Sequence, residues 1–144
     1  MELEFKNAEV SDINIIYELS KNLIDTYENI DEIEYEKVLE WVKKKITKCI
    51  NEYTCVCLDN QVVAYYHFQL VEDKMELDDL YVLSNYQNQG IGSKILEKCC
   101  EESNIPIFLY VFSKNTRAIA LYERFGFKVI EKIKDTRLIM QRDI

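Results

Sequence analysis

Glycine, proline and histidine are scarce in this sequence of 144 residues, which contains three glycines, one proline and one histidine. No linker rich in proline or glycine divides the chain, so we predict one domain over residues 1–144. No apolar run is long enough to span a bilayer, and the N-terminus lacks the basic stretch and apolar core of a secretory signal. We therefore expect a cytoplasmic protein without a membrane partner, whose 48% hydrophobic residues suffice for a packed core.

The cysteines give little sign of a disulfide framework or of a metal site. Their number is odd, which argues against a set of paired disulfides. No second pair of cysteine or histidine residues stands at the spacing that zinc sites use. We therefore predict no bound metal and five reduced thiols, at Cys49, Cys55, Cys57, Cys99 and Cys100.

Positive charge is also in short supply. The chain has 18 Lys and Arg residues against 26 Asp and Glu residues, which gives a net charge of −8 and a pI of about 4.8. A nucleic-acid-binding protein needs basic patches to neutralise phosphates, so we expect no nucleic-acid partner. The acidic balance favours a cationic partner such as an amine, although solubility alone accounts for it equally well.

Hydrophobic periodicity predicts seven strands and four helices in the order β-α-α-β-β-β-α-β-α-β-β. The expected strands span residues 5–8, 53–58, 62–71, 75–83, 107–112, 127–133 and 137–140. The expected helices span residues 13–24, 35–50, 91–102 and 115–125. A hairpin meander followed by a β-α-β unit implies a mixed α/β (α+β) fold, with one mixed sheet and helices on both of its faces.

Two of the three glycines open a predicted helix. Gly90 and Gly92 follow a strand and stand in one helical turn, where each glycine costs about 0.5–1 kcal/mol relative to alanine. Bare backbone at this position allows an anion to approach the free N–H groups of the first helical turn. The third glycine, Gly126, follows a predicted helix and is expected to end it in a left-handed conformation.

The glycine pattern alone does not identify its ligand. It is neither the G-x-G-x-x-G of dinucleotide-binding proteins nor the G-x-x-x-x-G-K-[S/T] of P-loop proteins. A tight connection from strand to helix without any ligand also explains it, and so does a different phosphorylated ligand.

Two motifs together resemble the signatures of the Gcn5-related N-acetyltransferase (GNAT) family. The first, similar to the pyrophosphate loop Q/R-x-x-G-x-G/A, is Gln87-x-x-Gly90-x-Gly92. The second, similar to N-x-x-A-x-x-x-Y-x-x-x-G-F, is Asn115-x-x-Ala118-x-x-x-Tyr122-x-x-x-Gly126-Phe127. An apolar strand lies between them, as in the family. The segment from Leu77 to Val82 also looks like the L-E-D-x-Y-V strand of the polyamine acetyltransferase branch, with Asp78 in place of the glutamate.

This resemblance implies a sheet that is mostly antiparallel and that splays between its fourth and fifth strands, where acetyl-CoA lies. The amide of Leu80 would bond the acetyl oxygen, the backbone of Val82 would hold the pantetheine arm, and the glycine loop would bind the pyrophosphate. By resemblance, the expected contacts to this co-substrate are Leu80, Tyr81, Val82, Gln87, Asn88, Gln89, Gly90, Ile91, Gly92, Ser93, Asn115, Ala118 and Tyr122.

The resemblance also implies a general acid at Tyr122, which helical spacing places on one face with Asn115 and Ala118. For the general base we consider two carboxylates of residues 75–83. Strand alternation predicts that Glu76, Asp78 and Leu80 share one side, so that Glu76 or Asp78 could accept a proton through water. Asp79 is then expected on the opposite side, and His67 on the neighbouring strand is a weaker alternative.

The predicted function is transfer of an acetyl group from acetyl-CoA to a primary amine, by direct attack in a complex that holds both substrates. A CoA-binding module without catalysis, acting as a sensor or scaffold, carries the same motifs and stays open as an alternative. The acceptor is expected to be a small amine or a peptide N-terminus, and the protein to be a monomer or a homodimer. Acidic residues of the N-terminal third could attract a cation, namely Asp25, Glu28, Asp31, Glu32, Glu34 and Glu36.

Overall fold

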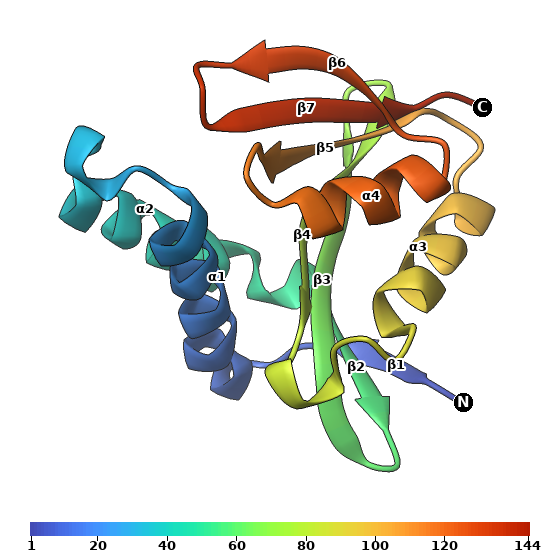
Figure 1. The fold of residues 1–144 in the computed structure, drawn as a ribbon. Helices are drawn as coiled ribbons and strands as arrows, with labels where there is room; N and C mark the ends of the chain where they lie inside the picture. The colour runs from blue at the N-terminus through green and yellow to red at the C-terminus, as the bar shows by residue number, and fades with distance from the viewer.

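The computed structural model describes all residues from 1 to 144 and contains one sheet of seven strands (Figure 1). Along the sheet the strands follow the order β1-β2-β3-β4-β5-β7-β6. Their bounds are β1 (Glu4–Asn7), β2 (Tyr53–Leu58), β3 (Gln61–Val71), β4 (Lys74–Val82), β5 (Ile107–Phe112), β6 (Lys128–Ile133) and β7 (Arg137–Arg142). The predicted number and order of strands are confirmed.

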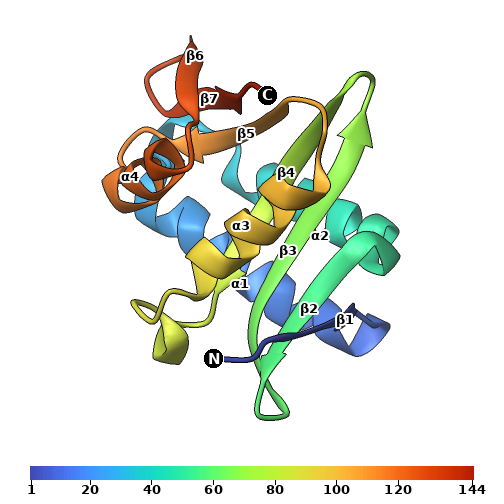
Figure 2. The ribbon, with the colours of Figure 1, turned by 90° about the vertical axis from the view of Figure 1, so that its right-hand side faces the viewer.

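Four α-helices cover the sheet, and they are α1 (Ile13–Tyr27), α2 (Tyr35–Cys49), α3 (Ile91–Glu102) and α4 (Thr116–Arg124). The first two lie on one face and the last two on the other (Figures 1 and 2). Short 3-10 helices, which the periodicity did not predict, are η1 (Val10–Asp12), η2 (Ile30–Glu32), η3 (Ile50–Glu52) and η4 (Ser84–Tyr86). None of the helices combines the length and the apolar content needed to cross a membrane.

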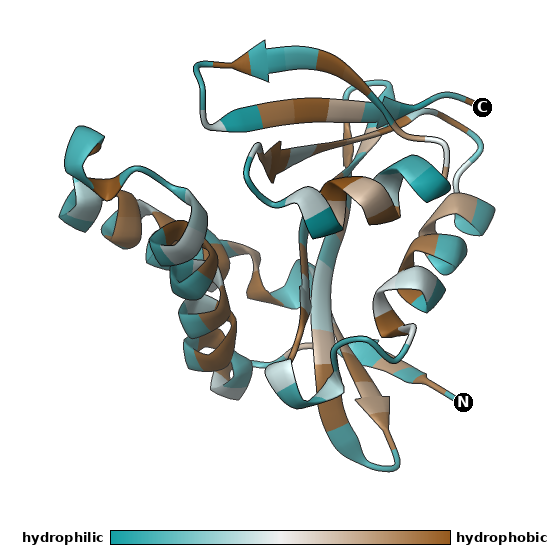
Figure 3. Ribbon diagram, viewed as in Figure 1, coloured by the Kyte–Doolittle hydropathy of each residue, from teal (hydrophilic) through white to brown (hydrophobic).

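A separate hydrophobic core fills each side of the sheet. The core under α1 and α2 includes Ile16, Ile46 and Tyr53, whereas the core under α3 and α4 includes Ile95 and Phe127. Each helix carries an apolar stripe and a polar stripe, visible as bands along the ribbon in Figure 3. This amphipathic pattern explains why sequence periodicity located the helices well.

The sheet combines antiparallel and parallel pairing. Strands β1 to β4 form an antiparallel meander, and β5, β7 and β6 form a second antiparallel group. The turn from β2 to β3 has positive φ angles at Asp59 (52°) and Asn60 (64°), which is typical of a tight two-residue hairpin turn. Only the contact between β4 and β5 is parallel. The predicted mixed, mostly antiparallel sheet is therefore confirmed.

The parallel strands β4 and β5 diverge soon after they meet. Their pairing consists of Met75 with Ile107 and Glu76 with Phe108. Beyond these two pairs β4 continues to Val82 without a partner on that side. The predicted splay is thus present, and it opens the middle of the sheet at the carboxyl ends of both strands.

The depth of the core predicts the cost of truncating its side chains. Ile95 of α3 is fully buried, whereas Leu70 of β3 is 63% exposed. We expect Ile95→Ala to lower the free energy of unfolding by about 3 kcal/mol, because it leaves a cavity in packed surroundings. Leu70→Ala is the control and should change it by less than about 0.5 kcal/mol. Urea unfolding of both variants measures the difference, and equal losses would contradict this assignment of the core.

Candidate active site

The opening between β4 and β5 exposes backbone groups of β4. The Leu83 amide donates to the Val63 carbonyl at 2.9 Å, and Tyr81 pairs with Tyr65. Because N–H and C=O groups alternate in direction along a strand, those of Leu80 and Val82 point away from β3 and into the opening. The polar groups of Leu80 and the amide of Val82 are therefore available to a ligand that lies along β4, whereas the Val82 carbonyl accepts a hydrogen bond from the Gln87 side chain.

A cleft of about 1710 Å³ runs through this opening. All but one of the predicted contact residues line it, and the exception is Gln89, whose side-chain amide donates to the Asn85 carbonyl at 3.3 Å. Tyr81 also borders the cleft, but its side chain packs under α1 and α2 and its phenol donates to Asp79 at 2.8 Å. The phenol of Tyr81 is therefore not free toward the cleft, and Gln89 lies outside the lining.

The loop before α3 presents unpaired amides to the cleft. The first intrahelical bond runs from the Lys94 amide to the Gly90 carbonyl at 3.1 Å, so the amides of residues 91–93 lack helical acceptors. The Gln87 side chain donates to the Val82 carbonyl at 3.0 Å and ties the loop to the end of β4. The helix dipole and the three free amides make this a site for an anion.

The structure requires glycine at only one of the two glycine positions of this loop. Gly90 has φ of +81°, a left-handed conformation that L-residues other than glycine adopt at a cost. A Cβ added to Gly92 would lie 3.4 Å from Cδ2 of Leu121 and 3.9 Å from Cγ2 of Val82, which are contacts that the protein tolerates. The conformation of the loop therefore demands glycine at position 90 and permits a small side chain at position 92.

The second predicted motif forms one wall of the cleft. Asn115 caps α4, because its side-chain oxygen accepts the Ala118 amide at 3.2 Å, which leaves its NH₂ group free. Asn115, Ala118 and Tyr122 all line the cleft, as their helical spacing predicted. The Tyr122 phenol makes no hydrogen bond within the chain, and burial together with the charge of Asp79 raises its pKa to about 12. It therefore remains a protonated, unpartnered donor at neutral pH.

One extra residue in β4 overturns the predicted alternation of its side chains. His67 pairs with Asp79 and Phe68 pairs with Leu77, so Asp78 has no partner on β3 and forms a β-bulge. Leu77 and Leu80 consequently both pack toward the core under α3 and α4. The prediction that Glu76, Asp78 and Leu80 share one side is wrong, because the bulge leaves the two carboxylates on the face opposite to Leu80.

Asp79 lies with Asp78 rather than on the opposite side. Both carboxylates contact Lys45 of α2, whose Nζ lies 2.7 Å from Asp78 and 3.2 Å from Asp79. Asp79 also accepts hydrogen bonds from the phenols of Tyr53 and Tyr81. Neither Lys45 nor the role of Asp79 was predicted, because only the bulge and the packing of α2 against β4 bring them together.

Asp78 and Glu76 differ in their environments. Burial raises the pKa of Asp78, but His67 and Lys45 outweigh burial and hold this pKa below its usual range. Burial and the charge of Asp78 raise the pKa of Glu76, whose carboxylate accepts a bond from the Gln69 amide at 3.1 Å. Glu76 is thus the more basic carboxylate and carries no ion pair.

The sole histidine lies outside the cleft. Its side chain is 1% exposed, and its two ring nitrogens lie 3.1 Å from Asp78 and 3.3 Å from Glu52. Burial lowers the pKa of His67, but the two carboxylates outweigh burial, so the net effect is a pKa above the usual value for histidine. His67 therefore has no direct access to a substrate in the cleft.

Comparison with known proteins decides the family. The model of the acetyltransferase (GNAT) family matches residues 16–127. The chain belongs to this family. The predicted enzyme class, an acyl-CoA-dependent N-acetyltransferase, is thereby confirmed.

Similar proteins include other GNAT enzymes. A spermidine N(1)-acetyltransferase of Thermoplasma acidophilum is 24% identical over 160 residues, covering 99% of this chain and 98% of that protein. The structure of the PaiA N-acetyltransferase from the same organism, in complex with coenzyme A, matches with a TM-score of 0.75 and 19% identity over 100% of both chains. The ribosomal-protein-S18-alanine N-acetyltransferase of Escherichia coli matches with a TM-score of 0.69 and 21% identity, over 99% of this chain and 94% of that one. At such identities the structures establish the GNAT fold.

The two glycines of this GNAT loop should respond differently to the same substitution. Gly90→Ala should lower the free energy of unfolding by about 1 kcal/mol, because the left-handed backbone strains a side chain. Gly92→Ala serves as the matched control and should change it by less than about 0.5 kcal/mol, since the added methyl has room. Urea unfolding of both variants compares them. A larger loss for Gly92→Ala would mean that packing against Leu121, rather than the conformation at position 90, governs this loop.

Proposed function

We propose that this GNAT enzyme transfers the acetyl group of acetyl-CoA directly to the amine of a small cationic acceptor. One observation carries the proposal. A single cleft holds the free backbone groups of Leu80, the free amide of Val82, the unpartnered phenol of Tyr122 and the basic carboxylate of Glu76. These groups meet the needs of thioester aminolysis, which are a held thioester, a proton acceptor for the amine and a proton donor for the thiolate.

The cleft fits acetyl-CoA, which supplies an activated thioester when bound. The free amides of residues 91–93 suit its pyrophosphate, since both the amides and the helix dipole favour an anion. Gly90 and Gly92 keep side chains away from that end of α3, and the free NH₂ group of Asn115 faces the same cleft. The unpaired backbone groups of Leu80 and the unpaired amide of Val82 suit the amide-bearing pantetheine arm, which can pair with them as a strand does.

Leu80 and Tyr122 would act on the two atoms that gain negative charge. As the amine nitrogen forms its bond to the carbonyl carbon, the Leu80 amide donates to the carbonyl oxygen and stabilises its charge. When the carbon–sulfur bond breaks, the sulfur takes its electron pair, and the Tyr122 phenol gives it a proton. The raised pKa keeps Tyr122 protonated for this step.

Glu76 would accept the proton that the amine loses, through a water molecule. A base must be ionised yet basic, and the raised pKa of Glu76 suits this better than the lowered pKa of Asp78. Asp78 and Asp79 are already paired with Lys45, so we assign them to holding α2 against β4.

The acceptor side of the cleft favours a polycationic amine. Glu28, Glu32 and Glu34 line it between α1 and α2, together with the indole of Trp41. Three other acidic residues considered from sequence, Asp25, Asp31 and Glu36, lie outside the lining. An ammonium group gains from nearby carboxylates and from the face of an indole ring. Thiol release with spermidine, set against a neutral peptide with a free N-terminus, tests this choice, and a higher kcat/KM for the peptide would overturn it.

We further propose that the residues form one catalytic domain in a reducing, cytoplasmic setting, as a monomer or homodimer. The single seven-stranded sheet supports one domain, and the five free cysteines suit a reducing compartment.

Replacing the proposed acid tests the reaction. Tyr122→Phe should lower kcat by roughly 10²–10⁴-fold, since a positioned acid contributes that much, and should leave affinity for CoA nearly unchanged. Tyr110→Phe, on the cleft wall of β5, is the control and should retain most of the activity. Steady-state thiol release and CoA titration measure both. In the parent enzyme, kcat should not fall as the pH rises through 10, the ordinary pKa of tyrosine, because the pKa of Tyr122 is higher.

If Tyr122→Phe keeps the parent kcat, the proton comes from elsewhere. If no amine is acetylated although CoA binds, the chain is a CoA-binding module instead.

Replacing the proposed base should change the pH dependence. Glu76 must be ionised to act as a base, and its pKa lies above 4.5, the ordinary pKa of glutamate. As the pH falls through the pKa of Glu76, the carboxylate becomes protonated and kcat/KM should fall. Glu76→Gln should lower kcat/KM and remove that acidic limb, whereas Glu97→Gln, exposed on α3, should preserve it. A limb that persists in Glu76→Gln would show that another group accepts the proton.

A further inference from the structure

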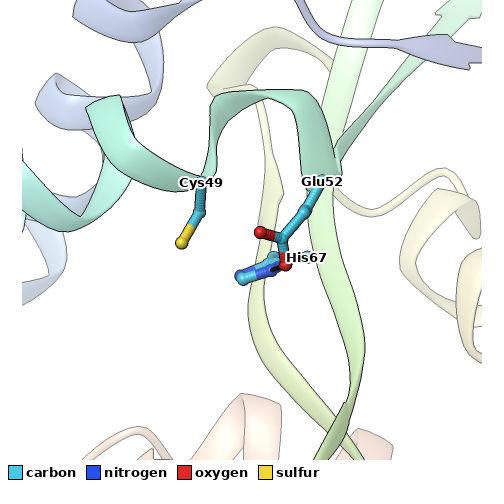
Figure 4. Close-up of side chains that lie close together, drawn as sticks. All are labelled: Cys49, Glu52 and His67. Carbon is cyan, nitrogen blue, oxygen red and sulfur yellow. Dashed lines mark hydrogen bonds and ion pairs between the residues drawn. The ribbon is translucent and has the colours of Figure 1, made fainter.

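Three potential metal ligands lie together outside the acetyl-transfer cleft. They are Cys49 at the end of α2, Glu52 in η3 and His67 on β3 (Figure 4). Their ligand atoms all lie within 4.8 Å of one another. None of the three lines the cleft, so the cluster is separate from the groups that we assign to acetyl transfer.

The spacing of the cluster suits a tetrahedral metal. Nε2 of His67 and Oε1 of Glu52 lie 3.3 Å apart. Two ligands that each bind zinc at about 2.0 Å with a tetrahedral angle are also separated by about 3.3 Å. Sγ of the half-buried Cys49 lies within 4.8 Å of both atoms, and a zinc–sulfur bond is longer than a zinc–nitrogen bond, at about 2.3 Å.

The imidazole is already oriented as a ligand. Nδ1 of His67 contacts the Asp78 carboxylate at 3.1 Å, and the ring stacks on Tyr53 with 4.7 Å between centroids. Metal-binding histidines generally donate their second ring N–H to a carboxylate, which holds the ring and strengthens the ligand. The contact with Asp78 leaves Nε2 facing Glu52 and Cys49.

We propose that Cys49, Glu52 and His67 bind a transition metal ion of the zinc class. One sulfur, one nitrogen and one oxygen ligand match zinc, whereas a thiolate does not suit magnesium or calcium. Three protein ligands leave a fourth position for water. On binding, Cys49 coordinates as the thiolate and its proton passes to solvent.

The location implies a structural and positioning role. The metal ties the end of α2 to β3 and, through His67, also holds Asp78 in the bulge of β4. Asp78 in turn contacts Lys45 and lines the cleft. Binding to the folded state alone stabilises it by mass action, so the melting temperature should rise when Zn²⁺ is added.

Cobalt substitution of the full reduced chain tests the site. We expect one Co²⁺ per chain, with the visible bands of tetrahedral cobalt and a near-ultraviolet band from sulfur-to-cobalt charge transfer. Cys49→Ser should abolish the charge-transfer band, and calorimetry should show a loss in Zn²⁺ affinity of at least about tenfold. Glu52→Gln, exposed in its short turn, should weaken Zn²⁺ binding but leave the sulfur band in place. It also provides a second variant should Cys49→Ser fold poorly.

Cys100→Ser is the matched control, since this half-buried thiol lies on α3 at the opposite face of the sheet. It should bind Co²⁺ as the parent does. Two further thiols on the same face of the sheet are Cys55 and Cys57, whose sulfurs lie 3.9 Å apart. No sulfur band in the parent, an unchanged band in Cys49→Ser, or a band that vanishes only in Cys55→Ser would each overturn the proposal.

Discussion

The separation of β4 from β5 is the feature on which the rest of the site depends. A buried strand edge must satisfy its N–H and C=O groups, yet those of Leu80 and Val82 face an opening after only two residue pairs join the strands. A ligand that can pair with backbone therefore completes the sheet. The free amides of α3 and the wall of α4 flank the same opening, so the groups that we propose for phosphate binding, thioester positioning and protonation all line one cleft.

The bulge at Asp78 determines which face of the sheet each acidic side chain of β4 occupies. Without the bulge, strict alternation would place the side chains of Asp78 and Leu80 on the same face of the sheet and that of Asp79 on the other face. With it, Asp78 and Asp79 both face α2 and share Lys45. A half-buried lysine between two carboxylates avoids an isolated charge and anchors α2, which carries part of the proposed acceptor side. Glu76, outside this ion-pair group, retains the raised pKa that a base needs.

Local signals predicted much of this protein. Amphipathic periodicity located all four helices, because it depends on neighbours in sequence. The same holds for the glycine loop before α3. The left-handed conformation of Gly90 belongs to the local backbone of this loop. The helical spacing of α4 likewise placed Asn115 and Tyr122 on one wall of the cleft.

Side-chain direction beyond the bulge and contacts between distant elements could not be predicted in this way. The bulge depends on how β3 pairs with β4. The periodicity of one strand does not show whether that strand has an extra residue relative to its partner. Likewise, Cys49, Glu52 and His67 carry no recognisable spacing, because packing of α2 and η3 against β3 alone brings them within 4.8 Å. The sequence by itself determined the elements, the family motifs and their order. Only the tertiary structure decided which face each carboxylate occupies, because that depends on pairing between segments far apart in the chain.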